Sequence, residues 1–199
     1  MTWQAVYYHY CKWCVADVLK KIWTSILEKY KSKFDLWSVD FDGGHTSAIR
    51  GDEDVEYQGR KKRKTTNALY LSDRQGLPLA ISNPAVGNHN DLYNIEVQFE
   101  VVTGTMEQAN IPVDGLFLNA DAGFDSKEFR LCCEKKEMHA NVCFNKRNGD
   151  AERDEYFDQL LYNEKYKIER TNVWMDNYRY LLNRFDTATA SWALIILHL

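Results

Sequence analysis

The stretch LWSVDFDGG, residues 36–44, decides the fold class of this chain. Its apolar, β-branched and aromatic residues predict a strand over residues 36–42, because such residues favour the half-buried surface of a sheet. Two glycines follow Asp42 directly, and paired glycines usually end a strand in a turn. Asp42 therefore lies at the predicted carboxyl end of a strand, where the ligands of open α/β sheets gather.

Further strands and helices are predicted after this stretch. Four strands are expected over residues 67–72, 78–82, 115–120 and 139–144. Apolar residues at helical spacing predict three helices, over residues 92–106, over residues 126–137 and from about Glu169 to Phe185. Asn90 or Asp91 is the expected N-cap of the first helix, and Trp174 is expected in the apolar face of the last. The order predicts an α/β fold, a mixed sheet of about five strands flanked by helices. Ribonuclease-H-like nucleases have the same element order, which is an analogy of fold and not of chemistry.

The region before residue 35 is predicted to be helical. Apolar residues recur at three- and four-residue steps over residues 3–13 and again, on one face, over residues 15–30. A chain of 199 residues is too short for two large domains. We therefore expect a helical N-terminal segment, residues 1–34, and one domain, residues 35–199.

The composition is that of a soluble globular protein, with 45% hydrophobic and 27% charged residues. The net charge of −4 argues against a generally basic nucleic-acid-binding protein, although a local basic patch can bind DNA within an acidic chain. Charged residues interrupt the N-terminal apolar runs, and the apolar segment 192–199 is too short to span a bilayer. We expect a cytoplasmic protein without a membrane partner.

The five cysteines form no regular framework. Cys11 and Cys14 make a CxxC pair, and two others are adjacent. A zinc site needs a second pair of ligands, which His139 and Cys143 supply only loosely. Free thiols in a reducing compartment are the favoured interpretation, with zinc as the alternative.

Two more acidic residues occupy positions comparable to that of Asp42. Asp121 follows the strand predicted over residues 115–120, and Glu169 lies near the start of the last helix. If the two strands are neighbours, Asp42 and Asp121 lie close together and repel each other unless a divalent cation binds. Two such ions suit the in-line displacement at a phosphodiester. The competing interpretation is that these acids form turns or cap helices, as Asp125 and Ser126 are placed to do.

The densest positive cluster comes just before the second predicted strand. It consists of Arg60, Lys61, Lys62, Arg63 and Lys64. Such a run contacts phosphates in DNA-binding proteins, and it also occurs on solvated hairpins and protected sheet edges. Five consecutive cations favour contact with DNA.

His45 and His89 lie on predicted loops near strand ends. Either could contact DNA, transfer a proton or support a metal ligand. An ordinary hydrogen bond is the simpler interpretation of a histidine in a loop, so both are supporting candidates only.

Five strings of the sequence are specific when they are taken together and in order. They are DGGHT (42–46), YQGRKKRKTTNALYLSDRQGLPLA (57–80), GNHNDL (87–92), LFLNADAGFDSKEFR (116–130) and YNEKYKIERTNVWMDNYRYLLNRFD (162–186). These strings resemble DDE transposases of bacterial insertion sequences, in the insertion-sequence-four/five superfamily. The resemblance covers almost the whole chain, from residue 3 to about residue 192.

The resemblance implies a ribonuclease-H-like fold and a catalytic triad that binds metal. Asp42 matches the first acidic residue of the family, Asp121 the second and Glu169 the third. The cofactor implied is Mg²⁺ or Mn²⁺, with two ions expected.

The surroundings of the glutamate also match the family, with one departure. Tyr162 and Lys165, seven and four residues before Glu169, match the family's tyrosine and basic residue. Asp176 stands where a lysine or arginine is common, which puts that phosphate contact in doubt. The DNA-binding residues expected are therefore Lys165, Arg170 and the basic run.

The function implied is DNA transposition by metal-dependent cleavage and strand transfer, with double-stranded DNA as partner at the element ends and the target. A homo-oligomer is left open. Family members have a DNA-binding region before residue 3 and a longer closing helix after residue 192. We therefore expect a truncated or altered copy in which residues 1–34 are a remnant of that region. Two alternatives stay open: an inactive fragment that only binds DNA or a full-length partner, and a general nuclease of the same fold. The expected location is the bacterial cytoplasm, at the nucleoid when bound to DNA.

Overall fold

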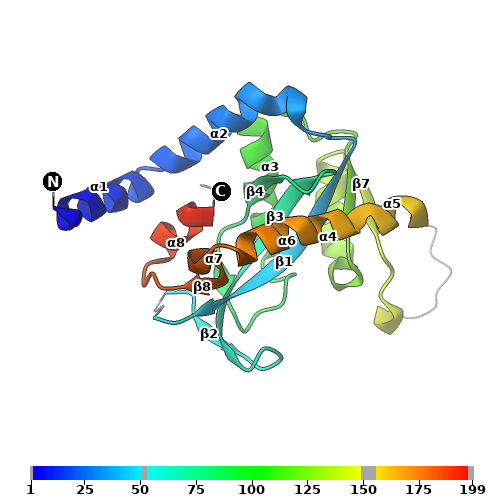
Figure 1. Cartoon of the computed structure of the whole chain (residues 1–199). Helices are drawn as coiled ribbons and strands as arrows, with labels where there is room; N and C mark the ends of the chain where they lie inside the picture. Colours follow the sequence, from blue (N-terminus) through cyan, green and yellow to red (C-terminus); the bar gives the residue numbers. More distant parts are fainter. Residues whose placement is uncertain (1, 51–52, 149–155, 197–199) are drawn as a thin grey trace.

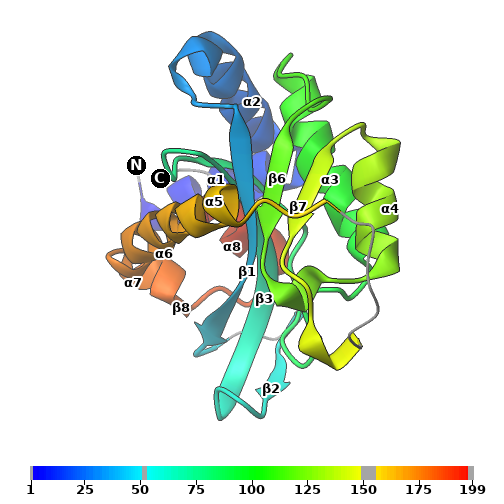
Figure 2. The same cartoon turned by 90° about the vertical axis from the view of Figure 1, so that its right-hand side faces the viewer.

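The computed structural model describes residues 2–50, 53–148 and 156–196 of the chain. Within these residues one mixed sheet crosses the molecule, and helices cover both of its faces (Figures 1 and 2). Its strands are β1 (Ser38–Ala48), β2 (Glu56–Gln58), β3 (Arg63–Asp73), β4 (Pro78–Ile81), β5 (Ala85–Val86), β6 (Phe117–Ala120), β7 (His139–Val142) and β8 (Asn183–Arg184). The central order is β2-β3-β1-β6-β7, with β4 and β5 paired to β3 and β8 paired to β1.

The pairing around β1 gives the sheet its mixed character. β1 runs antiparallel to β3 and parallel to β6, and β6 runs parallel to β7. The α/β class and the mixed sheet flanked by helices are confirmed, and each of the five predicted strands is present. The short strands β2, β5 and β8 lie outside the prediction.

β1 is longer than predicted, and Asp42 lies within it rather than at its end. Gly43 and Gly44 do not turn but continue the ladder with β3. A Cβ at Gly44 would meet the ring of Tyr70 at 2.8 Å, so the glycine makes room for an aromatic neighbour on the next strand. The pairing of β1 with β6 ends just before Asp42, because Phe41 is the last residue of β1 in that ladder.

One face of the sheet carries the main hydrophobic core, under α3 (Ile95–Gln108) and α4 (Lys127–Lys135). Odd-numbered residues of β1 contribute to this face. Phe41 stacks on Phe129 of α4 at 5.5 Å and meets Phe99 of α3 edge-on at 5.8 Å. The predicted start of α4 is confirmed, because Ser126 Oγ accepts a hydrogen bond from the Phe129 amide at 3.1 Å.

The start of α3 differs from the prediction. Its N-cap is Asn94, with a φ of 50°, and neither Asn90 nor Asp91 caps it. Asp91 instead accepts a hydrogen bond from Asn67 Nδ2 at 2.8 Å. This carboxylate is therefore directed to β3 and not to the helix.

One helical run crosses the opposite face of the sheet (Figure 1). It consists of α5 (Gln159–Asn163), η4 (Glu164–Lys167) and α6 (Ile168–Asp176). Trp174 lies in α6 but is 48% exposed, so its predicted place in a core is wrong.

The predicted helix to Phe185 is also wrong beyond α6. A short helix α7 (Arg179–Leu182) is followed by β8, which pairs with the end of β1, and then by α8 (Thr189–Ile196). β8 places Arg184 against the sheet, where its side chain is buried. Its guanidinium donates to Thr66 Oγ1 at 2.7 Å and to the carbonyl oxygen of Thr187 at 3.0 Å.

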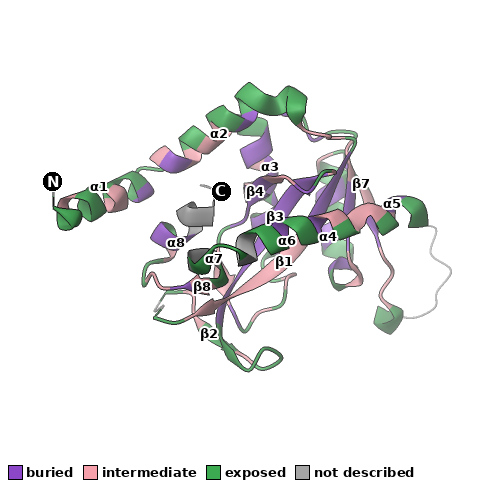
Figure 3. Cartoon of the chain, viewed as in Figure 1, coloured by how far each residue is buried: buried purple, intermediate pink, exposed green. Residues whose placement is uncertain are grey.

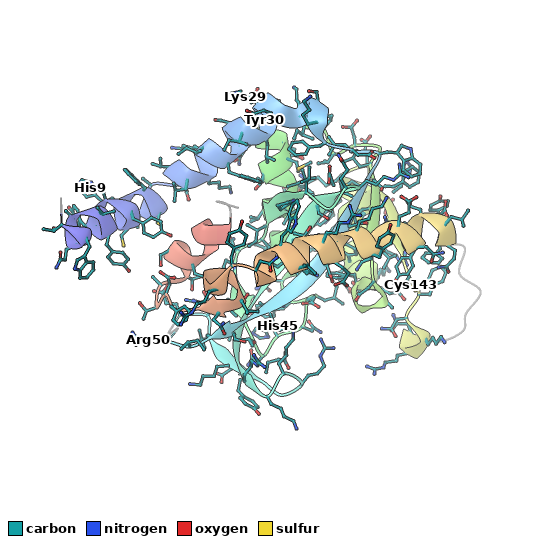
Figure 4. The ribbon with its side chains drawn as sticks, in the orientation of Figure 1. His9, Lys29, Tyr30, His45, Arg50 and Cys143 are labelled. Carbon is teal, nitrogen blue, oxygen red and sulfur yellow. The ribbon has the colours of Figure 1, made fainter. Side chains whose placement is uncertain are left out.

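The N-terminal region is helical, as predicted, and the two predicted apolar stripes correspond to two helices. α1 (Trp3–Val15) and α2 (Val18–Tyr30) are separated at Asp17, whose φ of 52° is left-handed. Leu27 of α2 joins the main core. α1 is mostly exposed, and His9 lies on it away from the sheet (Figures 3 and 4). The division of the chain at residue 34 stays a prediction.

The remaining features are local. Short 3₁₀ turns are η1 (Lys31–Lys33), η2 (Ala122–Phe124) and η3 (Lys146–Asn148). All five cysteines are free thiols. The apolar segment 192–199 lies partly outside the described residues. In the described ranges, no helix has the length and apolar character needed to cross a bilayer.

Candidate active site

The face of the sheet under α5 and α6 carries polar side chains in two rows. The inner row lies within the strands, and the outer row lies two residues further along each of them. The inner row is set by the register, which pairs Asp40 with Asn119 of β6 and Asn119 with Asn141 of β7. Side chains alternate along a strand, so residues two positions further on return to the same face. Asp42 is that residue on β1, and Asp121 directly follows Ala120, the last residue of β6. The parallel pairing of the two strands therefore brings the two predicted carboxylates together.

Asp42 is in contact with both the sheet and the helical run. Its Oδ1 accepts a hydrogen bond from the Gly43 amide at 2.9 Å, and its Oδ2 lies 3.8 Å from Lys165 Nζ. Burial raises the pKa of Asp42, Lys165 opposes this, and the negative charges of Asp121 and Asp91 raise the pKa further. The carboxylate is thus placed where a positive charge stabilises it.

Asp121 combines a local structural contact with its position at the site. Its Oδ1 accepts a hydrogen bond from the Gly123 amide at 2.7 Å and caps η2. A Cβ at Gly123 would lie 2.8 Å from this oxygen, so the turn can close tightly on a glycine. The interpretation of Asp121 as a cap is therefore correct, and it coexists with the proximity to Asp42.

The helical run brings two of the expected residues over the pair of acids. Lys165 in η4 contacts Asp42, as described above. Tyr162 at the end of α5 has a raised pKa, first because of burial and then because of the charges of Cys143, Asp121 and Asp42. Figure 4 labels Cys143 just after β7, next to the helical run. The phenol and the ammonium therefore border the same site.

Glu169 lies one helical turn after Lys165, near the start of α6, and is exposed. In the ranges that the structure describes, no three His, Cys, Asp or Glu side chains gather closely enough to hold a metal ion. Two carboxylates, Asp42 and Asp121, come together with an ammonium, and Glu169 stands outside that group. A pair of hard oxygen ligands suits Mg²⁺ or Mn²⁺, which bind through one or two carboxylates and retain water.

Asp40, the nearest acidic neighbour of Asp42 in sequence, has a different environment. It is buried, and its Oδ1 accepts a hydrogen bond from Asn119 Nδ2 at 2.9 Å. Burial raises the pKa of Asp40 to about 6, against the opposing effect of that hydrogen bond. Asp40 therefore belongs to the interior of the sheet, and Asp42 to the site.

Three residues near the site were not predicted: Asn119, Asn141 and Asp91. Asn119 and Asn141 complete the inner row, and Asp91 acts on Asp42 through its charge. A signal for the first two is present in the sequence, because a polar residue precedes Asp121 and Cys143 by two positions, as Asp40 precedes Asp42. No local pattern marks Asp91, whose position depends on the fold.

Arg60, Lys61 and Lys62 form the exposed turn between β2 and β3, and Arg63 and Lys64 begin β3, far along the β1–β3 ribbon from α5 (Figure 2). Lys62 at the tip has a φ of 53°. Arg63 donates to Ser47 Oγ at 2.9 Å, which ties the turn to the end of β1. Arg170 is exposed on α6. These cations are accessible to a large ligand, whereas Lys165 faces Asp42.

Both histidines have local partners. His45 lies within β1 rather than on a loop, with Nδ1 3.2 Å from Thr65 Oγ1 (Figure 4). Burial lowers the pKa of His45, and Asp91 opposes this. His89 stacks on Tyr93 with a ring separation of 3.6 Å. These contacts fit the simpler interpretation, that each histidine makes ordinary structural interactions.

Comparison with known proteins bears on this site. The family described as "DDE superfamily endonuclease" matches residues 42–198, a match that begins at Asp42. No curated protein sequence matches the chain. Two structures resemble it: the Mos1 transposase paired-end complex with left transposon end (15% identity, TM-score 0.39) and the Mos1 mariner paired end complex with Mn (14% identity, TM-score 0.37). Each comparison covers 90% of this chain and 57% of the Mos1 chain.

Proposed function

This chain belongs to the DDE superfamily endonuclease family, and we propose that it is the catalytic part of a transposase of bacterial insertion sequences, in the insertion-sequence-four/five superfamily. The proposed reaction is metal-dependent cleavage of DNA at the element ends, followed by attack of the freed 3′ hydroxyl on target DNA. The observation that supports the proposal is the register of β1 and β6, whose last pair, Phe41 and Ala120, comes immediately before Asp42 and Asp121.

In this proposal each residue has a defined task. Asp42 and Asp121 hold the cofactor from the sheet, and Glu169 completes the set of ligands from α6. When bound, a pair of Mg²⁺ or Mn²⁺ ions stabilises the charge of an in-line phosphoryl displacement and lowers the pKa of the attacking water. Lys165 neutralises Asp42 in the absence of the ions and contacts a DNA phosphate in their presence. The ammonium 3.8 Å from Asp42 supports this role.

DNA is the proposed partner, at the element ends and at the target. Exposed Arg60, Lys61, Lys62 and Lys64 at the β2–β3 turn, together with Arg170, supply positive charge for its phosphates. Such an enzyme works in the bacterial cytoplasm, at the nucleoid, because its substrate lies there. A second copy of the chain is the proposed partner for joining two element ends.

The test is cleavage of DNA that carries the ends of the parent element, in Mg²⁺ or Mn²⁺. Asp42→Asn, Asp121→Asn and Glu169→Gln each remove one ligand charge with little change of shape. We expect each to reduce the cleavage rate by more than about a hundredfold, the upper end of what partners of metal ligands cost. Asp114→Asn, an exposed acid outside the site, is the matched control and should cut normally. Undiminished cutting by Asp121→Asn would contradict the assignment.

The alternative function is a catalytically inactive chain that only binds DNA or a full-length partner. The position of Glu169, outside the pair of acids, favours it. The same assay separates the two, because retention of DNA without any metal-dependent cutting supports the alternative. Cutting that is independent of the end sequence indicates a general nuclease instead.

DNA binding by the basic turn has its own test. Replacing Lys61, Lys62 and Lys64 by alanine should weaken binding similarly for all DNA sequences, because phosphate contacts carry no sequence information. The slope of log affinity against log salt concentration should flatten by about 0.9 for each phosphate that the variant no longer neutralises. Lys20 and Lys29 on α2 are controls of the same residue type. An unchanged slope in the triple variant would remove the turn from the DNA interface.

A further inference from the structure

A small cavity lies between β3 and the start of α3, on the core face of the sheet. Its volume is about 10 Å³, which is room for a single water-sized sphere. Asn67 of β3 and Gln98 of α3 both line this cavity. Their side chains are 3% and 7% exposed, so their polar atoms need partners inside the protein.

Two buried oxygen atoms of the cavity lining have no hydrogen-bond partner among the described residues. They are Asn67 Oδ1 and Gln98 Oε1. The orientation of the Asn67 amide is set by its other end, because Nδ2 donates to Asp91 Oδ1 at 2.8 Å. The oxygen of Asn67 is therefore left for another group. Because a buried acceptor without a donor is costly, such atoms usually mark the place of a bound ion or water.

Asp91 adds a negative charge to the lining of the same cavity. Its carboxylate lies against Gly43, because a Cβ at that glycine would collide with it. The carboxylate and the two amide oxygens are all hydrogen-bond acceptors. A water molecule supplies two protons and needs donors for its lone pairs, whereas a cation needs oxygen ligands alone. Three acceptors with one negative charge therefore suit a cation better than a water molecule.

The size and charge of the cavity indicate which cation it suits. Mg²⁺ retains several water molecules, for which a single water-sized sphere leaves no room, and Ca²⁺ takes about six to eight oxygen ligands. K⁺ is close to a water molecule in size and binds carbonyl oxygens in place of its hydration shell. The one carboxylate, that of Asp91, balances its single charge.

We propose that Asn67, Gln98 and Asp91 form a binding site for K⁺, which fastens the start of α3 and the loop before it to β3. The site goes beyond the proposed function and is separate from the pair of acids. It lies on the core face of the sheet, whereas Asp42 and Asp121 belong to the face under α5 and α6. Its ligands are two neutral amides and one carboxylate, a set that suits a monovalent ion.

The test is urea unfolding of the full chain in KCl and in tetramethylammonium chloride at equal ionic strength, without DNA or divalent cations. Tetramethylammonium is too large for the cavity. A ligand that binds only the folded chain lowers the unfolding equilibrium constant by a factor set by the ratio of its concentration to its Kd. For a Kd of about 10 mM, about 100 mM KCl should lower this constant about tenfold. Equal stability in the two salts would overturn the proposal, because a water molecule alone then fills the cavity.

Variants of one residue assign the K⁺ effect to this cavity. Gln98→Met keeps the length of the side chain and removes its oxygen, so this variant should unfold alike in the two salts. Gln108→Met changes an exposed glutamine at the end of α3 and is the matched control, which should keep the wild-type difference. A K⁺ effect that survives in Gln98→Met would come from another site and would overturn the assignment.

Gln98→Glu serves where Gln98→Met does not fold. It adds a second negative charge to the cavity and should increase the dependence of stability on K⁺. A dependence no larger than that of the wild type would overturn the proposal.

A second measurement locates the ion directly. Rb⁺ replaces K⁺ in sites of this kind and scatters X-rays anomalously, which a water molecule does not. Crystals of the chain grown in RbCl should show an anomalous peak between Asn67 Oδ1 and Gln98 Oε1. Density of a water molecule there, without such a peak, would overturn the proposal. Neither measurement involves DNA cleavage, so a negative result in either leaves the proposed function untouched.

Discussion

The candidate site has two halves that are held in different ways. Asp42 lies in β1 and Asp121 directly follows β6, and backbone ladders on both sides of β1 fix the positions of these strands. Lys165 and Glu169 belong to a helical run that lies on the sheet and is attached through a small number of side chains. One attachment is Asn141 at its start, and the others lie near residues 164–171, against the turn between β3 and β4.

This difference fits the arrangement in the described residues, where the charge of Asp121 acts on Asp42 and Glu169 joins no group of three acids. A ladder places a side chain by repeated hydrogen bonds, so its position is known once the register is known. A helix on a sheet is placed by packing and by a few polar contacts, each of modest strength. The helix-borne half should therefore respond to single substitutions that leave the strand-borne half intact.

The largest effect should come from Gly76, at the turn between β3 and β4. Its φ is +83°, and a Cβ there would lie 2.5 Å from the carbonyl oxygen of Lys167. Gly76→Ala should cost about 1–2 kcal/mol for the left-handed backbone alone, plus the displacement of the helical run. Urea unfolding measures the loss of stability, and Mn²⁺ titration measures the effect of displacing the helical run on metal binding.

Gly115 provides the control for Gly76. Its φ is +74°, and a Cβ there would meet nothing within 4 Å. Gly115→Ala should therefore show the backbone cost without any change in Mn²⁺ affinity. Equal losses of stability, with equal Mn²⁺ affinity in both variants, would show that the helical run does not depend on this contact.

An intermediate effect is expected from Thr171 of α6. Its buried hydroxyl donates to the carbonyl oxygen of Gly76 at 2.6 Å. Thr171→Val should lower the free energy of unfolding by about 1 kcal/mol, or somewhat more because the carbonyl loses its partner. Thr103→Val, which removes a hydroxyl bonded only within α3, should cost less. A loss at Thr103 as large as that at Thr171 would argue against a special attachment of α6.

The smallest effect should be the pH dependence of the ion pair between Arg74 and Glu164. Arg74 Nε lies 2.6 Å from Glu164 Oε2, and the hydrogen bond from Arg74 is the main reason why the pKa of Glu164 falls to about 2 from its ordinary value of 4.5. A carboxylate with a lowered folded-state pKa stabilises the fold above the ordinary pKa, and this contribution is lost as the pH falls from about 4.5 towards 2.

Urea unfolding across this pH range measures the contribution. The stability of the wild type should decrease more steeply with acidification than that of Glu164→Gln, whose side chain does not titrate. The difference should be small, because partly exposed ion pairs contribute little. If the free energy of unfolding falls equally with pH in the wild type and in Glu164→Gln, the ion pair does not stabilise η4.

The strand-borne half was also the part that the sequence predicts well. Alternation of apolar and polar residues and the acids after Phe41 and Ala120 are local patterns, and they indicate both the strands and the candidate residues. Gly43 and Gly44 misled the prediction, because a Cβ at Gly43 would meet the carboxylate of Asp91 and one at Gly44 would meet the ring of Tyr70 on a neighbouring strand. A contact between residues this far apart leaves no mark in the local pattern.

The helix-borne half was predicted less well, for a related reason. Apolar spacing around Trp174 is the same whether the face is covered or open, and the structure leaves this side chain half exposed. The break before β8 depends on the burial of Arg184 against Thr66, a partner 118 positions away in the sequence. The position of Glu169 relative to the acids depends on the same kind of long-range contact.

Under the proposed function, the long pairing of β1 with β3 sets the distance along a bound nucleic acid between Asp42 and the basic turn. The ladder continues from Asp42 to Ser47, where Arg63 is attached. Five strand residues span about 17 Å at about 3.4 Å each, and one nucleotide step in a duplex strand is about 3.4 Å as well. If a DNA duplex binds along this ribbon, the basic turn would contact its phosphate backbone about five nucleotides from the bond that is cut. Lengthening β1 and β3 by two residues each should therefore move this phosphate contact by about two nucleotides and leave the cleavage reaction unchanged.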